Sequence, residues 1–419
     1  MSKLELRLLN GSLFIFLTFV IMNLVKFIGG VSAIGSVGKL GFSVSFIIFV
    51  LVAVNRSKFK IKLLNKVESL LILICLVLFA VIFVYLNRSR INLLPNLAFP
   101  IYFIFYYLIV KLFIRANLLE SGKAALEVVK LNIIYVIRFT LYINFFVWFS
   151  LALIFNVNMF EIDGGFGGFF QDEIHFGLYM VTGFFVSFYM RFNSFYSDKS
   201  YFNLLLMIVY GSLLLYTSRN ALLIVLVALV YFFVISRIKN WIYGIILLLT
   251  PVVLAGLNIF LQGLTFQRIN EITSGRFQIW TYAIEKMNET NSWILGNGLF
   301  NLNDIVLKAN VGKGSMYLDS LRSLSFHSSY LEILAAGGVI AVFLFFVVII
   351  KIWKEFSSID RSIMFGILIG ASFESYLVQP FMLISSLFYL ILLINSFKVR
   401  IVYKGDDLGY GFLKPIHSN

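Results

Sequence analysis

The chain has 419 residues, of which 60% are hydrophobic and only 13% are charged. A soluble domain carries about 25% charged residues, so this composition excludes soluble enzymes, disordered chains and fibrous proteins. Lys and Arg number 34 against 20 acidic residues, a net charge of +14, but they gather in short clusters between long apolar runs. Such clusters are typical of cytoplasmic loops under the positive-inside rule, so we expect no nucleic-acid partner. The single cysteine excludes an internal disulfide.

Apolar runs of the length that crosses a bilayer as a helix recur along the whole chain. At about 20 residues per crossing, the sequence predicts an all-α, polytopic membrane protein with about twelve transmembrane helices. The expected spans are residues 12–29, 38–54, 67–86, 97–114, 131–155, 173–192, 201–217, 219–236, 241–260, 330–350, 362–378 and 380–397. If both termini lie inside, the inner segments carry about 22 Lys and Arg residues and the outer segments about 10. The positive-inside rule therefore predicts that both termini lie in the cytoplasm. Residues 1–419 then form one transmembrane domain, with residues 261–327 as a large loop on the outer side between the ninth and tenth helices.

Two connections between the expected spans carry charged residues at helical spacing. Residues 115–130 alternate apolar and charged side chains, which predicts an amphipathic helix on the inner membrane surface. In the outer loop after the fifth span, His175 follows Gln171 and Asp172 at spacings of four and three, so these side chains can share one helix face. A divalent metal bound by His and carboxylate is conceivable there. Solvated charge is the plainer interpretation, and we expect no metal.

The large loop contains a second amphipathic pattern. Ser274 can cap a helix that begins near Arg276, next to Arg268 in the sequence. Apolar side chains then recur at three- and four-residue spacing: Phe277, Trp280, Ile284 and Met287. This pattern predicts a helix that lies on the membrane with its apolar face down. Guanidinium groups at that depth suit a lipid-linked phosphate or pyrophosphate, and contact with ordinary headgroups is the alternative.

Four further polar residues lie within or beside apolar runs, where charges usually face a polar interior. Arg219 stands in the tight turn between two expected spans. Arg138 and Glu374 fall inside spans and are candidates for an ion pair. His327 stands where the large loop re-enters the membrane. The alternatives are arginines that reach to the headgroups and a histidine that is only a hydrogen-bonded interface residue.

Three segments of the second half of the chain form a recognisable series. They are Tyr216-Thr-Ser-Arg219-Asn-Ala-Leu-Leu, then Gly275-Arg276-Phe-Gln-Ile-Trp280 with Leu295-Gly296-Asn-Gly298, and then His327-Ser-Ser-Tyr330-Leu-Glu332-Ile-Leu-Ala-Ala-Gly337-Gly338. In this order they resemble the T-x-S-R, R-x-x-x-W … G-x-G and H-N-x-Y-L motifs of the O-antigen polymerase and O-antigen ligase superfamily of bacterial envelope polysaccharide enzymes. Residues 168–177 resemble the motif that precedes the middle helix in the polymerase branch. The sequence departs from the pattern at Ser328, where the family has Asn, and at Asp172-Glu173, where Glu-Pro is more familiar.

The resemblance implies a metal-independent glycosyltransferase without a cofactor, active at the periplasmic face of the bacterial inner membrane. The large outer loop, residues 261–327, would then be periplasmic. Its donor would be a glycan on a polyprenyl pyrophosphate carrier. A polymerase moves the growing chain to a new carrier-linked repeat unit, whereas a ligase moves it to a lipid A core. We favour the polymerase because of the segment from Asp172 to His175. The expected partners are carrier-linked donor and acceptor oligosaccharides, membrane lipid and a chain-length regulator protein.

The resemblance also implies roles for individual side chains. Pyrophosphate leaves as a stable anion, so the reaction needs cations on the departing oxygens and a base near the acceptor hydroxyl. The candidate cations are Arg219, Arg276 and Arg268. The candidate catalytic residues are His327, Glu173 and Asp172, and the candidate supporting residues are Tyr330, His175 and Trp280.

Two other classes of function fit parts of the pattern. Twelve spans with both ends inside also suit a transporter or a flippase for lipid-linked oligosaccharide. Such carriers often show two similar halves and helices broken by Gly or Pro, whereas the halves differ here and the chain has only five prolines. A membrane scaffold or receptor is the remaining alternative, although no segment marks a partner surface.

Overall fold

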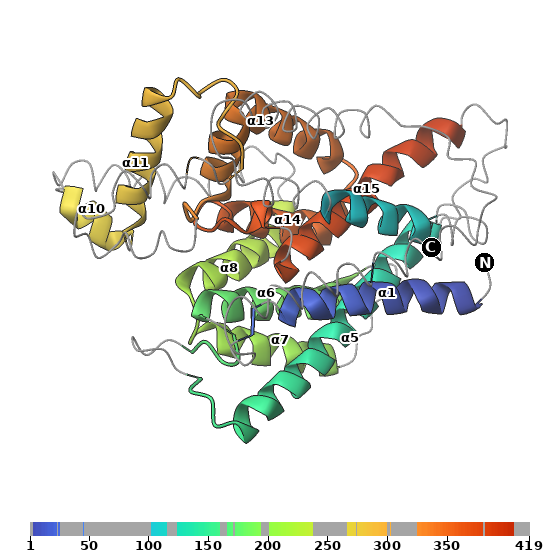
Figure 1. Cartoon of the computed structure of the whole chain (residues 1–419). Helices are drawn as coiled ribbons and strands as arrows, with labels where there is room; N and C mark the ends of the chain where they lie inside the picture. Colours follow the sequence, from blue (N-terminus) through green and yellow to red (C-terminus); the bar gives the residue numbers. More distant parts are fainter. Residues whose placement is uncertain are drawn as a thin grey trace.

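A computed structural model provides the fold (Figure 1). It describes residues 3–22, 24–25, 45, 102–114, 124–159, 166–170, 172–193, 201–237, 266–273, 275–299, 302, 325–379 and 382–405. Within these ranges the regular structure is helical, apart from one antiparallel bridge between Val25 and Phe170. The expected spans 67–86 and 241–260, and all of 38–54 except Ser45, lie outside the described residues.

The helices follow the apolar runs closely. They are α1 (Lys3–Met22), a helix over Tyr102–Ile114, α5 (Ala124–Ile154), α6 (Glu173–Phe192), α7 (Tyr201–Leu214), α8 (Arg219–Phe233), α10 (Phe266–Ile272), α11 (Arg276–Glu289), α13 (Ser329–Trp353), α14 (Ser358–Gly370) and α15 (Leu383–Gly405), with short 3-10 turns η1 (Ile235–Arg237) and η3 (Tyr376–Val378). Three stretches are long and apolar enough to cross a membrane: Leu126–Ile154, Arg219–Arg237 and Ser329–Trp353. The helical class is confirmed, and the long apolar helices fit a membrane protein. The count of twelve spans stays a prediction.

Two predicted elements differ from the structure. The expected span 362–378 is not one helix, because α14 begins at Ser358 behind a capping box and ends at Gly370, where the chain turns. The predicted surface helix over residues 115–130 is also wrong in its described part. Residues 124–130 are the first turns of α5, and Val129 and Lys130 there are buried in the bundle rather than lying on a surface.

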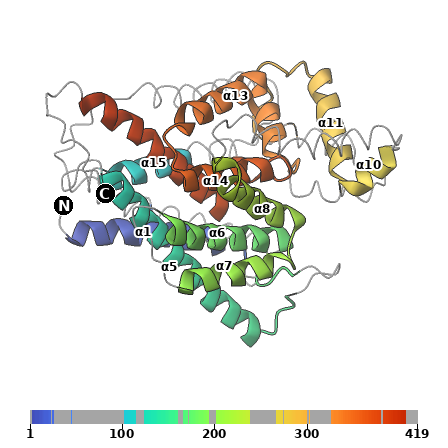
Figure 2. The ribbon, with the colours of Figure 1, turned by 180° about the vertical axis from the view of Figure 1, so that it is seen from behind.

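Neighbouring helices run in alternating directions, so the segments expected outside the membrane meet at one end of the bundle. Val25, just after α1, pairs with Phe170, just before α6. Asn220 Nδ2, in the first turn of α8, donates to Gly370 O at the end of α14 (3.2 Å). Ser329 N, at the start of α13, donates to Ala371 O (2.8 Å). We call this the loop end; α10 and α11 lie there, away from the start of α1, in both views (Figures 1 and 2).

A buried charged cluster holds the opposite end together. Lys130 Nζ of α5 lies 2.8 Å from Asp360 Oδ2 of α14 and 3.3 Å from Glu127 Oε1. Asn395 Nδ2 of α15 donates to the same Asp360 oxygen at 3.4 Å. Lys130 is 1% exposed and Asp360 is fully buried, so each charge depends on the other for solvation.

The helices α8 and α14 approach each other so closely that glycine is required between them. A Cβ on Gly366 would lie 2.5 Å from Ile224 O, the distance of a severe clash with backbone. Small residues at such contacts are typical of helix pairs in membranes, because they let two backbones approach. The close contact fixes the end of α14, and with it the segment that follows, relative to the start of α8.

Candidate functional site

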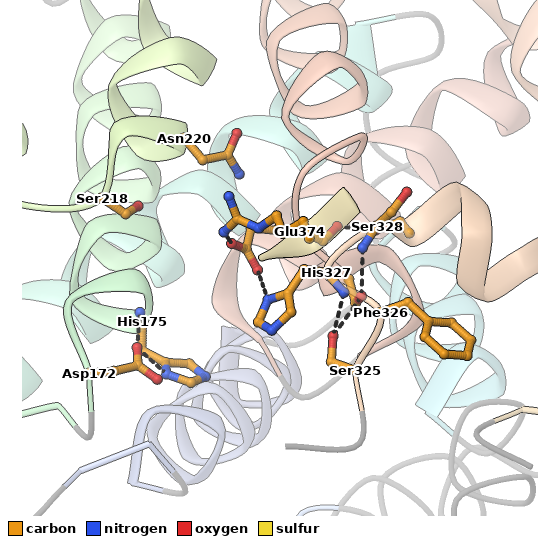
Figure 3. A network of polar contacts seen from close by, with 12 residues as sticks. Asp172, His175, Ser218, Asn220, Ser325, Phe326, His327, Ser328 and Glu374 are labelled. Carbon is orange, nitrogen blue, oxygen red and sulfur yellow. Dashed lines mark hydrogen bonds and ion pairs between the residues drawn. The ribbon is translucent and has the colours of Figure 1, made fainter. Parts of the chain in front are cut away.

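A carboxylate joins an arginine and a histidine at the loop end. Glu374 Oε1 lies 2.5 Å from Arg276 Nη2, and Glu374 Oε2 lies 3.3 Å from His327 Nδ1. The Glu374 side chain is 8% exposed, whereas those of Arg276 and His327 are 22% and 18% exposed. The carboxylate is therefore the buried anchor of the group, which we call the Glu374 cluster, and the cation and the imidazole are partly exposed. Figure 3 shows the contact between Glu374 and His327.

The backbone holds Glu374 in place independently of its side chain. The main-chain oxygen of Glu374 accepts hydrogen bonds from Ser329 N (3.0 Å) and from Ser329 Oγ (2.6 Å). Ser329 Oγ also accepts from Leu377 N at 3.1 Å, beyond Glu374 in the chain. The turn after α14 is thus fastened to the first residue of α13.

His327 occupies a strained turn between the large loop and α13. Its φ is +51°, in the left-handed region that non-glycine residues rarely adopt. His327 N donates to Ser325 Oγ at 3.0 Å, and Phe326 N donates to Glu332 Oε1 at 2.7 Å. These bonds fix the turn from both sides, so the imidazole points at Glu374 (Figure 3).

Ser328 explains one departure from the family pattern. It is the N-cap of α13, and its side chain accepts a hydrogen bond from Leu331 N at 3.4 Å. Ser and Asn are both favoured N-cap residues. The serine at this position therefore performs the cap that an asparagine would perform, and it leaves His327 at the same place before the helix.

The start of α11 places Arg276 in the Glu374 cluster. The N-cap is Gly275, with φ +81° and no side-chain cap, whereas Ser274, the predicted capping residue, lies outside the described residues. Two other residues bind the first amides: Asn270 Oδ1 accepts from Gln278 N (3.0 Å), and Thr273 Oγ1 accepts from Phe277 N (3.1 Å). The end of α10 thus caps α11.

The apolar face of α11 packs on protein. Ile279, Ala283 and Met287 are buried, at four-residue spacing, in a cluster with Phe326 and Ala335. Of the four residues expected to face the membrane, Ile284 is 41% exposed, and Trp280 donates its indole hydrogen to Phe326 O at 2.8 Å. The prediction of a side chain facing lipid is therefore wrong for Met287, because Phe326 and Ala335 give it an apolar partner within the protein. Trp280 does lie beside the histidine turn.

The Gly-Asn-Gly segment after α11 fits into a break in α13. The helix is interrupted at Gly338, whose φ is +67° and ψ is −167°. This leaves carbonyl groups that accept from the loop, since Asn297 N donates to Ala335 O (2.7 Å) and Gly298 N to Ala336 O (2.8 Å). A Cβ on Gly338 would lie 2.1 Å from Ile294 O. The second and third sequence motifs are therefore parts of one backbone interlock.

The structure does not bring the other predicted cations into the Glu374 cluster. Arg219 is exposed at the first position of α8 and has no ion pair among the described residues. The neighbouring Asn220 donates a hydrogen bond to Gly370 O, four residues before Glu374 in the chain. The backbone of Arg219 therefore lies at the same end of the bundle as Glu374. Arg268 is exposed on α10 and does not contact Glu374. Tyr330 donates to Leu368 O at 2.6 Å and so joins α13 to α14.

The suggested ion pair between Arg138 and Glu374 is wrong. Arg138 Nε donates to Tyr142 Oη at 2.8 Å, and its guanidinium lies 5.4 Å from the Tyr142 ring centre and 5.6 Å from that of Phe202. Glu374 instead completes the site, a role that sequence reasoning missed. The sequence does offer one signal for this role, because Glu374 is a carboxylate inside an apolar run. Its partners are Arg276 and His327 rather than the predicted Arg138.

Asp172 and His175 form a second carboxylate–histidine pair, as their spacing predicts. Asp172 is the N-cap of α6, and its side chain accepts from His175 N at 2.7 Å. The ring atom His175 Nδ1 lies 2.6 Å from Asp172 Oδ1, at an angle that departs from a linear hydrogen bond. Burial opposes the charged form of Asp172, but the hydrogen bonds and charge of His175 outweigh it and lower the pKa of Asp172. Glu173 is half-buried as the first residue of α6, and Gln171 lies outside the described residues.

Long apolar helices that bring arginine, histidine and glutamate together at one end describe a membrane protein with a polar site at its surface. The family model described as O-antigen ligase matches residues 202–346 of the chain. This match confirms the resemblance seen in the motifs and supports the superfamily of O-antigen ligases and polymerases, which is associated with glycosyl transfer. The matched range includes Arg219, Arg276 and His327, but it begins after His175 and ends before Glu374. A search of curated proteins finds no match.

Proposed function

We propose that this protein is a polysaccharide polymerase, which transfers a growing glycan from polyprenyl pyrophosphate to a new lipid-linked repeat unit. The observation that supports it most directly is the Glu374 cluster, in which one buried carboxylate orients an arginine and a histidine at the end of an apolar helical bundle. The carrier's lipid tail has to remain in the bilayer, so a site at the ends of membrane helices suits it. The family match supports the reaction class.

Arg276 supplies the positive charge that the leaving group needs. One guanidinium nitrogen binds Glu374, and the remaining donors have no partner among the described residues. Arginine carries five donors in a planar fork that can hold two oxygens of a phosphate. Arg219 is the second cation of the proposed site. Loss of one such cation should raise the barrier by about 2–4 kcal/mol, as for other groups that stabilise a developing anion.

The transfer itself exchanges one bond for another at the anomeric carbon of the donor. The acceptor hydroxyl oxygen forms the new bond, while the bond from that carbon to the pyrophosphate oxygen breaks. Its electron pair leaves with the polyprenyl pyrophosphate, which Arg276 stabilises, and the hydroxyl proton passes to a base. We propose that no metal or cofactor takes part, because guanidinium groups can carry the charge of the leaving group.

The orientation belongs to the same proposal. The loop end would face the periplasm and the Lys130–Asp360 end the cytoplasm, in the bacterial inner membrane. Single cysteines placed at exposed positions of the loop end, for example at Glu289, would react with an impermeant thiol reagent added to whole cells. Labelling that requires broken cells would overturn this orientation. A separate chain-length regulator is proposed as a partner.

The alternative within the superfamily is a ligase, and the family match supports ligase and polymerase alike. The segment from Asp172 to His175 supports the polymerase, because it resembles the polymerase branch and lies outside the matched range. Deletion of the gene in its host, followed by gel analysis of surface and carrier-linked glycan, separates the two. Single repeat units on the surface without a ladder would support the polymerase. Long polymer left on the carrier would mean a ligase, and repeat units retained on the inner leaflet would mean a flippase.

A further inference from the structure

The loop end carries two carboxylate–histidine pairs. The Glu374 cluster alone accounts for binding of the pyrophosphate leaving group, so the second pair has no role in the proposed function so far. In the first, Glu374 Oε2 lies 3.3 Å from His327 Nδ1, and in the second, Asp172 Oδ1 lies 2.6 Å from His175 Nδ1. Both pairs lie in one view of this end of the bundle (Figure 3). A polymerase has to bind two substrates at once, a charged donor and an acceptor with a reactive hydroxyl.

Packing connects the second pair to the segment that carries the first. A small cavity of about 10 Å³ has His175 on its wall together with Leu383, the first residue of α15, and Met382 just before it. Both follow Glu374 in the chain by fewer than ten residues. Two residues after His175, α6 touches the start of α8: a Cβ on Gly177 would lie 3.3 Å from Ser218 Oγ. The two histidines therefore belong to elements that meet at the same end.

The Asp172 contact determines which ring nitrogen of His175 can react. Asp172 Oδ1 lies 2.6 Å from Nδ1 without the geometry of a hydrogen bond, and the negative charge of the carboxylate favours the proton on this nearer nitrogen. Nε2 then has a lone pair, and it has no hydrogen-bond partner among the described residues. An imidazole held in this way by a carboxylate is arranged to accept a proton through Nε2.

The surroundings of the two histidines differ in charge. His327 shares its carboxylate with Arg276, so the negative charge of Glu374 is balanced by a guanidinium and an anion can approach. No arginine or lysine pairs with Asp172 among the described residues. The cavity beside His175 is apolar in its other walls, which include Ile21, Leu178 and Tyr179 from α1 and α6. A phosphate would be repelled there, whereas an uncharged sugar hydroxyl would not.

We infer that His175 is the base for the acceptor, and that the Glu374 cluster binds the pyrophosphate of the donor. This inference rests on the proposed polymerase function. The acceptor hydroxyl binds at His175 Nε2 and gives up its proton there as its oxygen bonds to the anomeric carbon of the donor glycan. The bond from that carbon to the pyrophosphate breaks, and the electron pair leaves on the phosphate oxygen beside Arg276. Protonated His175 then returns the proton to water.

The test uses the full chain in lipid nanodiscs with a synthetic polyprenyl-pyrophosphate-linked repeat unit as both donor and acceptor. Two products are measured: elongated glycan, and repeat unit released by water from the same carrier. His175→Gln keeps a polar side chain without a base, and Arg276→Gln removes the cation. Lys286→Gln, on the exposed side of α11, is the matched control for loss of a positive charge. Thermal melting shows which variants are folded.

We expect His175→Gln to lose at least 100-fold in elongation while hydrolysis of the donor falls less than threefold. Arg276→Gln should lose both products, and Lys286→Gln neither. Asp172→Asn retains the helix cap but not the carboxylate charge, so it should lower elongation by about tenfold. Equal loss of both products in folded His175→Gln would overturn the assignment, as would normal elongation. Loss in Glu173→Gln alone would transfer the role to Glu173. A wild-type protein that hydrolyses or elongates nothing would instead refute the proposed function.

Discussion

Substitution of Glu374 by glutamine tests whether one carboxylate organises the proposed donor site. Glutamine has the same shape, but it is neutral and has one oxygen instead of two. It can accept from Arg276 or from His327, but it cannot bind both as the carboxylate does at 2.5 Å and 3.3 Å. The bonds that fasten this turn to Ser329 use the main-chain oxygen of Glu374, so the substitution leaves them in place. The variant should therefore fold while its site is disordered.

The size of the effect follows from the contact that is lost. A hydrogen bond to a charged group contributes about 1.5–3 kcal/mol, and the Glu374 side chain is buried enough for water not to replace it. If that energy holds Arg276 in place for the transition state, the rate of transfer falls by roughly 10- to 150-fold, since about 1.4 kcal/mol corresponds to a factor of ten. Alanine in place of Glu374 removes both contacts and should lower the rate further.

Glycan elongation in nanodiscs measures this effect, with the melting temperature as the control for folding. Because elongation and hydrolysis both use the donor bound at the Glu374 cluster, the loss should appear in kcat, and donor hydrolysis should fall in parallel with elongation. A folded Glu374→Gln protein that elongates glycan at the wild-type rate would refute the role assigned to the Glu374 cluster. The double variant Glu374→Gln/Arg276→Gln gives a second test. If Glu374→Gln lowered the rate as much in the Arg276→Gln protein as in the wild type, the two residues would act independently, and the assigned role would also be refuted.

Other predictions concern the remainder of the fold. Lys130→Met leaves Asp360 buried without its partner and should destabilise the protein by about 3–5 kcal/mol, with the double variant Lys130→Met/Asp360→Leu recovering most of the loss in a melting experiment. Gly338→Ala puts a Cβ 2.1 Å from a backbone oxygen at φ +67° and should lower the melting temperature together with elongation. Folding lowers the pKa of Asp172. The ionised carboxylate therefore stabilises the folded protein fully above the usual aspartate pKa of about 3.9, and this stabilisation is lost as the pH falls through the lower pKa of the folded state. The melting temperature of Asp172→Asn should therefore depend less on pH below about pH 4 than that of the wild type. A chelator should leave elongation unchanged, and restoration by a divalent ion after loss would disprove the metal-free mechanism.

Local signals in the sequence were sufficient for most of the described helices. The span predicted over 173–192 coincides with α6, since Asp172 caps its start and an unbroken apolar run follows. Ser218 likewise caps α8, which begins at Arg219 as the turn predicts. The predictions were less accurate where a long-range contact decides. The chain turns after Gly370 because Ser329 binds the carbonyl groups there, and no pattern within residues 362–378 reveals that partner.

The same distinction applies to the candidate site. The motifs identified His327 and Arg276, which the structure brings together, but they could not show that Glu374 joins them, because 47 and 98 residues separate Glu374 from its two partners. The spacing of apolar residues in α11 shows that one face of the helix is apolar, but it does not show whether that face packs on lipid or on protein. Only the long-range packing against Phe326, before α13, and Ala335, within α13, decides for protein.

The glycines of the motifs have an architectural role in this arrangement. Gly296 and Gly338 both have positive φ, and a Cβ on either would collide with the backbone of the other segment. Their contact fixes the end of α11 against α13, while Trp280 fixes its middle against Phe326. Arg276, at the start of the same helix, is thereby held at the carboxylate of Glu374. The motif residues furthest from the ion pair therefore determine its geometry, which is why substitution of a glycine should impair transfer without removing any charged group.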